Sequence, residues 1–194
     1  MVKQLNINPV EPRDEIEAYQ KALHWFFAYP TTEISLTELC KLLKISKTTA
    51  NRVVTLLVGE GFLKKQEIGN LWRISCNLNH PYNFTRKVAY NILMVYESGV
   101  LEAIHKQIPN PKAIVLFGSY RKGDDAENSD LDIAVEVIDD EDVRIGELGV
   151  VAQLGYRKNV HVSLHVFSRN RINLNMFANI ANGIVLEGFL EVRP

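Results

Sequence analysis

Two short polar motifs, each joined to an apolar run, most constrain how the second half of this chain can fold. Gly118 and Ser119 follow a run typical of a buried strand, and Asp130 and Asp132 open the next apolar run about ten residues later. Glycine lets a backbone turn sharply and approach a ligand, and the amides that open a helix favour phosphate. Residues i and i+2 of a strand face the same side, so the two carboxylates converge. This order predicts a triphosphate on the turn and metal ions on the adjacent strand.

The carboxylate pair has a structural alternative. Asp130 could cap a turn and Asp132 could be solvated, and for an isolated Asp-x-Asp we would prefer that interpretation. Two like charges side by side on a strand are unfavourable without a cation, and Mg²⁺ typically binds one or two carboxylates plus substrate phosphates. The preceding Gly-Ser turn favours the site, with Mg²⁺ or Mn²⁺ as the ion. Further candidate phosphate contacts are Arg121, Lys122 and Ser129.

Alternation of apolar segments after residue 110 indicates a layered α/β unit. We expect strands over 113–117, 131–137 and 160–167, helices over 141–156 and 170–182, and a short final strand or helix extension over 184–186.

The motif Gly118-Ser119-Tyr120-Arg121-Lys122-Gly123, with Ser129-Asp130-Leu131-Asp132, resembles the signature of the nucleotidyltransferase superfamily. The resemblance spans roughly residues 110–190 and is nearest to the minimal nucleotidyltransferases, which are similar in fold to DNA polymerase beta. It implies a mixed sheet flanked by helices, NTP bound with Mg²⁺, and transfer of a nucleoside monophosphate to a hydroxyl. Gly118 and Ser119 would hold phosphates, and Asp130 and Asp132 would be the catalytic metal ligands. Acceptors in such families include partner toxin proteins, antibiotics and nucleic acid ends.

The chain departs from that pattern at the third carboxylate. Active members usually place it on the next core strand, where this chain has Ser163, flanked on the same face by His161 and His165. Serine is a poor ligand for a hard dication. Either histidine could act as a base, although we favour polar residues on a half-exposed strand. Glu136 is another candidate substitute.

The first part of the chain indicates three helices and a hairpin. A helical stripe runs from Glu15 to Tyr29, a capping box at Ser35–Glu38 opens a second helix, and Ser46 can cap a third. Gly69-Asn70 suits a hairpin turn. This order predicts a winged helix-turn-helix, and residues 46–63 resemble the recognition helix and following strand of bacterial and archaeal winged-helix regulators.

A few basic residues on the third helix and the hairpin of that unit are consistent with DNA binding. Helix residues would meet bases and phosphates, and hairpin cations would meet phosphates. A protein-interaction module is the alternative, and a dimer would prefer a two-fold DNA site. The candidate DNA contacts are Lys47, Thr48, Thr49, Asn51, Arg52, Lys64, Lys65 and Arg73.

Between the two units, apolar residues at helical spacing predict one long helix over 83–108, which could also pack against a partner subunit in a homodimer. We therefore divide the chain into a winged-helix domain (14–80), a connecting helix (81–109) and a nucleotidyltransferase-like domain (110–194).

Composition gives weaker constraints. Residues 1–80 carry ten Lys and Arg against eight Asp and Glu, whereas residues 110–194 carry nine against thirteen. That direction fits a nucleic-acid-facing front half, although ordinary solvated faces explain it equally well. Cys40 and Cys76 lack metal-ligand spacing, the first nine residues lack a secretory core, and no apolar run reaches the roughly 20 residues that span a bilayer. We expect a cytoplasmic protein that does not bind membranes.

Two functional hypotheses follow. In the first, the protein transfers NMP from NTP to an unknown acceptor. In the second, it is a transcriptional regulator whose nucleotidyltransferase-like domain binds nucleotide but catalyses weakly or not at all.

Overall fold

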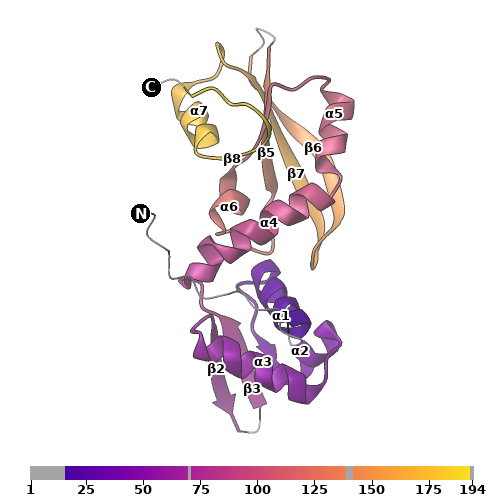
Figure 1. Cartoon of the computed structure of the whole chain (residues 1–194), viewed down its shortest axis with the longest axis vertical. Coiled ribbons are helices and arrows are strands. Elements are labelled where there is room, and N and C mark those ends of the chain that lie inside the picture. The colour runs from indigo at the N-terminus through magenta and orange to yellow at the C-terminus, as the bar shows by residue number, and fades with distance from the viewer. Residues whose placement is uncertain (1–15, 70, 139–141, 193–194) are drawn as a thin grey trace, which may run out of the picture.

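The computed structural model describes residues 16–69, 71–138 and 142–192, which form two units stacked along the long axis of the molecule (Figure 1). The N-terminal segment before residue 16, with the predicted helix start at Glu15, lies outside the described residues. So do Asn70 of the predicted hairpin turn, Glu141, and the chain end after residue 192.

The N-terminal unit contains three helices and an antiparallel sheet in which β3 lies between β1 and β2. The predicted helices and hairpin are therefore confirmed as elements. Their bounds are α1 (Ile16–Ala28), β1 (Ile34–Ser35), α2 (Leu36–Leu43), α3 (Lys47–Gly59), β2 (Leu63–Ile68) and β3 (Leu71–Cys76).

Both predicted helix caps in this unit are present. The Ser35 hydroxyl accepts the Glu38 amide at 3.3 Å, and the Glu38 carboxylate accepts the Ser35 amide at 3.0 Å. At α3 the Ser46 hydroxyl accepts the Thr49 amide at 3.1 Å. Each bond satisfies an amide that has no partner within its helix. Apolar side chains facing one another then form a core that includes Phe26, Leu39 and Leu57.

The predicted single helix over 83–108 is wrong, because the structure has a short 3₁₀ turn and two helices there. They are η1 (Pro81–Phe84), α4 (Arg86–Glu97) and α5 (Val100–Gln107). Gly99 has φ +78°, a left-handed conformation that cannot continue a right-handed helix. The chain changes direction at Gly99, so α4 approaches the N-terminal unit while α5 packs on the sheet of the C-terminal unit (Figure 1).

The C-terminal unit is built on a five-stranded mixed sheet of order β6-β7-β5-β4-β8. β5 and β7 are parallel, and the other neighbouring pairs are antiparallel. The elements are β4 (Ala113–Leu116), α6 (Gly118–Lys122), β5 (Leu131–Val137), β6 (Arg144–Leu154), β7 (Arg157–Ser168), α7 (Leu174–Ala181) and β8 (Ile184–Gly188).

The helix predicted over 141–156 is also wrong, because residues 144–154 form the edge strand β6. This strand pairs antiparallel with β7 and turns through Gly155 and Tyr156. Two glycines, Gly146 and Gly149, disfavour a helix, and neighbouring valines favour a strand. Pairing with β7 satisfies the backbone groups of β6 that face β7.

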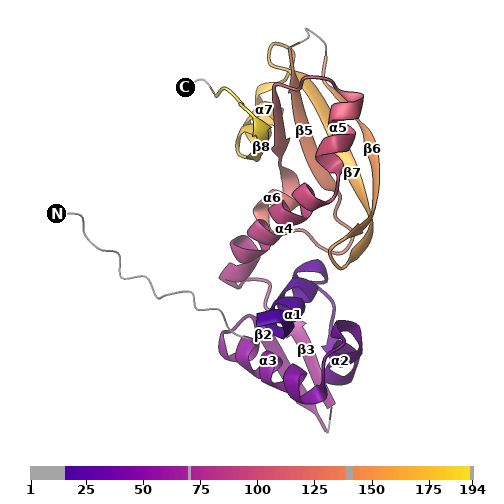
Figure 2. The ribbon, with the colours of Figure 1, turned by 45° about the vertical axis from the view of Figure 1, so that its right-hand side comes forward.

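Helices cover both faces of this sheet (Figure 2). α4 and α5 pack on the face that carries Leu131, Ile133 and Val135, whereas α7 packs on the face that carries Ala134. Asp132 alternates with the first set and so lies on the second face, as predicted. No helix in the described part of the chain is long and apolar enough to cross a membrane.

Candidate functional site

The turn after β4 brings the backbone of Gly118 directly against the carboxylate of Asp132. Gly118 has φ +69°, and a Cβ at this position would lie 2.2 Å from Oδ2 of Asp132. The neighbouring Phe117 amide donates to the main-chain carbonyl of Asp132 at 3.1 Å. The two predicted motifs are therefore adjacent in space, and glycine is required for the contact.

The electrostatics of Asp132 depend on burial and on the second aspartate. Burial raises the pKa of this carboxyl, His165 acts in the opposite direction, and the charge of Asp130 raises it further. Asp130 itself is exposed. A carboxylate that is partly buried beside a like charge gains from a bound cation.

The third position holds Ser163, which pairs in register with Asp132 across the parallel β5–β7 ladder. Of the candidate substitutes, His165 comes nearest, with Nε2 3.9 Å from Oδ1 of Asp132. Its Nδ1 is buried without a hydrogen-bond partner, and its ring packs edge-on against Phe117 at 4.9 Å. Burial lowers the pKa of His165, whereas Asp132 opposes that shift.

The other two candidate substitutes are engaged elsewhere. His161 is exposed and contacts Glu147 of β6 at 2.7 Å. Glu136 is buried and pairs with Lys112 at 3.1 Å and Arg169 at 3.2 Å. The structure thus gives neither residue a contact with the two aspartates.

The remaining predicted nucleotide residues lie around the same turn. Ser119 is on the first turn of α6, and Arg121 and Lys122 are on its last turn. Ser129 immediately precedes the aspartates, and its hydroxyl accepts the Ala126 amide at 2.9 Å. That bond closes the turn that leads into β5. A nucleotide contact by each of these four residues stays a prediction.

A metal ion would find two carboxylates here rather than three. Within the described residues, no three His, Cys, Asp or Glu side chains gather as a metal site. Asp130 and Asp132 still fit Mg²⁺ or Mn²⁺, because such an ion usually takes its other ligands from substrate phosphates and water.

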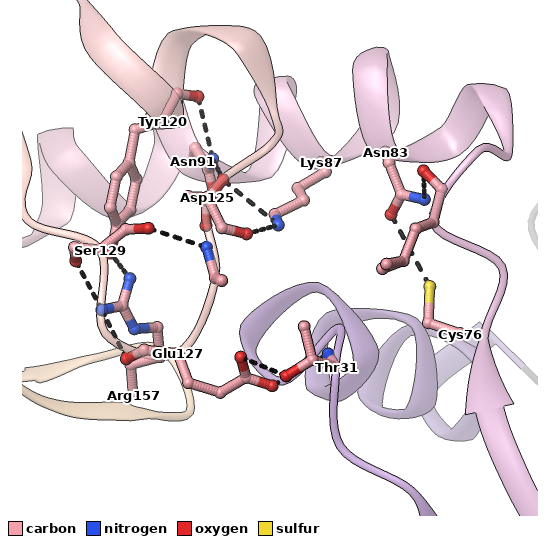
Figure 3. Close-up of polar contacts among 12 residues, drawn as sticks. Thr31, Cys76, Asn83, Lys87, Asn91, Tyr120, Asp125, Glu127, Ser129 and Arg157 are labelled. Atoms are coloured by element: carbon pink, nitrogen blue, oxygen red, sulfur yellow. Dashed lines mark hydrogen bonds and ion pairs between the residues drawn. The ribbon is translucent and has the colours of Figure 1, made fainter.

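Sequence reasoning missed a buried polar cluster beside this site (Figure 3). Lys87 and Asn91 of α4 contact Asp125, and Arg157 of β7 contacts Tyr120 of α6. Burial lowers the pKa of Lys87 and raises that of Asp125, while each charge opposes the shift of the other. The sequence spacing could have revealed this cluster, because Lys87 and Asn91 lie four residues apart on the side of α4 that also buries Val95.

The predicted DNA contacts lie on α3 and on the hairpin. Among the helix residues, Lys47, Thr48, Asn51 and Arg52 are exposed and Thr49 is partly exposed. Lys64 is exposed on β2. Two hairpin cations already contact carboxylates: Lys65 pairs with Glu67 at 2.9 Å, and Arg73 pairs with Glu33 at 3.2 Å. Nucleic acid binding by this surface stays a prediction.

Comparison with known proteins agrees with the geometry of the C-terminal unit. Residues 100–187 match the family model described as "Polymerase beta, Nucleotidyltransferase". This part of the chain is nucleotidyltransferase-like. The match begins at the first residue of α5 and includes the Gly-Ser turn, both aspartates and Ser163. No curated protein matches the chain.

Proposed function

We propose that the protein binds a nucleoside triphosphate with Mg²⁺, or Mn²⁺, and transfers its nucleoside monophosphate to an acceptor. The observation that carries this proposal is the contact between Gly118 and Asp132, which supports a phosphate-binding role for the turn and a metal-binding role for the carboxylate beside it. The family match over residues 100–187 supports the same class of chemistry.

In this proposal the protein residues divide into three roles. Gly118 and Ser119 offer main-chain amides to the phosphates, and Arg121 and Lys122 neutralise phosphate charge. Asp130 and Asp132 would hold the ion, which would supply neutralisation of the developing phosphate charge. His165 lies 3.9 Å from Asp132 and is the strongest candidate to accept the proton of the acceptor hydroxyl.

A second function is favoured by one specific observation, which is Ser163 in register with Asp132. Without a third carboxylate, the site would bind nucleotide and transfer it slowly or not at all. The protein would then be a regulator that senses nucleotide and passes the signal to its N-terminal unit.

We further propose that this N-terminal unit is a winged helix that binds DNA in the cytoplasm. The order of three helices and a hairpin supports this fold, and the exposed residues of α3 would enter the major groove. The acceptor could be nucleic acid, or a toxin-like protein recruited as a partner.

The experiment that separates the two functions uses α-labelled NTP, Mg²⁺ and three acceptors: the protein itself, DNA ends and co-purified partner protein. If the protein is a transferase, label appears on an acceptor, and Asp130→Asn or Asp132→Asn reduces it to background. Asp124→Asn is the matched control, because Asp124 is an exposed carboxylate of the same segment. Tight NTP binding without transfer would favour the regulator, and absence of both would overturn both functions.

DNA binding is tested separately. The protein should bind genomic DNA fragments with an affinity that falls as salt rises. Arg52→Ala should weaken that binding, whereas Lys106→Ala on α5 should not. Absence of DNA binding at low salt would point to a protein-interaction module.

A further inference from the structure

One short segment, residues 123–129, joins α6, which begins with Gly118 and Ser119, to Asp130. It leaves α6 after Lys122 and ends one residue before Asp130. It belongs to no helix or strand, and besides the bonds between Ala126 and Ser129 it is contacted by side chains of neighbouring elements. Any drift of this segment would move Asp130 relative to Gly118 and Ser119.

Arg157 holds this segment from the first position of β7 (Figure 3). Its guanidinium donates to the main-chain carbonyl of Glu127 at 2.8 Å and to that of Ser129 at 2.6 Å. The Ser129 carbonyl belongs to the same peptide unit as the amide of Asp130. Arg157 also donates to the Tyr120 hydroxyl of α6. The guanidinium of Arg157 thus connects α6 to the residues that lead into β5.

The chemistry of this contact suits a role for Arg157 in positioning the segment more than a role in stabilising the fold. Arg157 is only 7% exposed, and burying a charge is costly. The three oxygens that it contacts here are neutral, so they return less Coulomb energy than a carboxylate would. The planar guanidinium, however, offers five donors in a fixed arrangement, which suits several acceptors at set positions.

The opposite side of the segment is held from α4. The ammonium of Lys87 contacts Asp125 through its carbonyl and its carboxylate, and the Asn91 amide donates to the same carboxylate at 2.9 Å. Asn91 also donates to the Tyr120 carbonyl at 3.0 Å. Both clamps therefore include Tyr120, but Arg157 alone in this cluster contacts the peptide next to Asp130.

We propose that Arg157 is a positioning residue for the candidate active site. It fixes the peptide that enters Asp130 relative to the Gly118–Ser119 turn, so that metal and phosphate are bound together. This inference rests on the proposed nucleotide function.

The test compares Arg157→Met and Arg157→Lys with Arg169→Met. Arg169 is a fitting control, because it is a partly buried arginine that follows the other end of β7 and pairs with Glu136 and Glu191. Amide hydrogen exchange is measured without ligand. Binding of Mn²⁺ alone and of Mg²⁺–ATP is then measured at a temperature where each variant is folded.

We expect Arg157→Met to speed exchange at the amides of Ala126 and Ser129 while the amides of β5 stay protected. Its affinity for Mn²⁺ and Mg²⁺–ATP should fall about 10- to 100-fold, as for other groups that orient metal ligands. Arg157→Lys should also speed amide exchange and lower ligand affinity, but by smaller amounts than Arg157→Met. If Arg157→Met does not fold, the test uses Arg157→Lys alone. Arg169→Met should leave ligand affinity unchanged.

Three results would overturn the proposal. Unchanged exchange in both Arg157 variants would show that the segment does not depend on this side chain. Faster exchange with wild-type affinity would leave Arg157 a purely structural role. A wild-type protein that binds neither Mn²⁺ nor nucleotide would overturn the proposed function and this proposal together, whereas the first two results leave the proposed function standing.

Discussion

Gly118 illustrates how one residue can set the distance between two parts of a site. Its left-handed backbone and its contact with Asp132 both exclude a side chain. The Gly-Ser dipeptide is common in turns, so the dipeptide itself carries little information. Its meaning comes from the carboxylate on the neighbouring strand.

Gly118→Ala should therefore damage both stability and ligand binding. A non-glycine residue held in this conformation costs about 1–3 kcal/mol, and the new methyl group would displace the Asp132 carboxylate. We expect a lower free energy of unfolding in urea and a loss of Mg²⁺–ATP affinity by calorimetry.

The matched control is Gly59→Ala at the end of α3, where an added Cβ meets no atom within 4 Å. This change should be neutral or stabilise by up to about 1 kcal/mol. Equal effects of the two substitutions would contradict the importance of the Gly118 contact.

At the scale of elements, local signals predicted most helices and strands but not how they pair or bend. Ser35 and Ser46 marked helix starts correctly, because a cap is a contact between near neighbours in sequence. β6 was missed because its partner β7 supplies the hydrogen bonds that make it a strand. The break at Gly99 could have been read from the glycine, but apolar spacing on both sides suggested continuity.

The candidate site divides in the same way. The face of β5 that carries Asp132 could be predicted because a strand fixes which residues share a face, and Ser163 came from the resemblance to the nucleotidyltransferase signature. Asp130 lies one residue before β5, so the same rule does not place it. The role of Arg157 could not be predicted, since two of its three acceptors are main-chain carbonyls, which leave no trace in residue identities.

Packing of α1 on α4 adds a dependence on pH. The His24 ring stacks on Tyr90 with centroids 4.2 Å apart, and burial lowers the pKa of His24. The neutral ring is therefore favoured in the folded protein. Its contribution to stability is full above the unfolded pKa of about 6.5 and is lost as pH falls below that value.

His24→Phe keeps an aromatic ring and removes the titration. Between about pH 7.5 and about pH 5.5 this variant should lose less free energy of unfolding than the wild type. Other groups, including His165, titrate in both proteins, so the difference between the two pH profiles isolates His24. Parallel profiles in urea unfolding would show that the stack does not depend on protonation.

At the scale of the whole molecule, the N-terminal unit contacts the segment that leads to Asp130 and the β6–β7 hairpin. The Tyr29 hydroxyl of the N-terminal unit donates to the Tyr156 carbonyl at the tip of the β6–β7 hairpin at 2.9 Å. The Glu127 carbonyl accepts from Arg157, and its carboxylate contacts Thr31 (Figure 3). The same carboxylate also accepts the Thr32 hydroxyl. The segment before Asp130 thus contacts both units, and we expect the placement of the units and the geometry of the site to influence each other.

The carboxylate of Glu127 accepts the Thr31 amide at 3.0 Å, the Thr31 hydroxyl at 2.8 Å and the Thr32 hydroxyl at 3.1 Å. Glu127→Ala removes all three bonds, and Thr31→Val removes one while keeping the side-chain shape. Because the two residues share a bond, the double variant should be less destabilised than the sum of the single variants, by about 0.5–3 kcal/mol. Urea unfolding of the four proteins measures this coupling.

Thr37→Val is the control for that cycle, because Thr37 is exposed on α2 and should combine additively with Glu127→Ala. If Thr31→Val were also additive, the contact between units would contribute nothing measurable. A positive coupling has a further consequence, since Glu127→Ala would then loosen the segment that leads to Asp130 without touching Arg157. Such a variant should raise amide exchange at Ser129 and uncouple nucleotide binding from any ligand of the N-terminal unit.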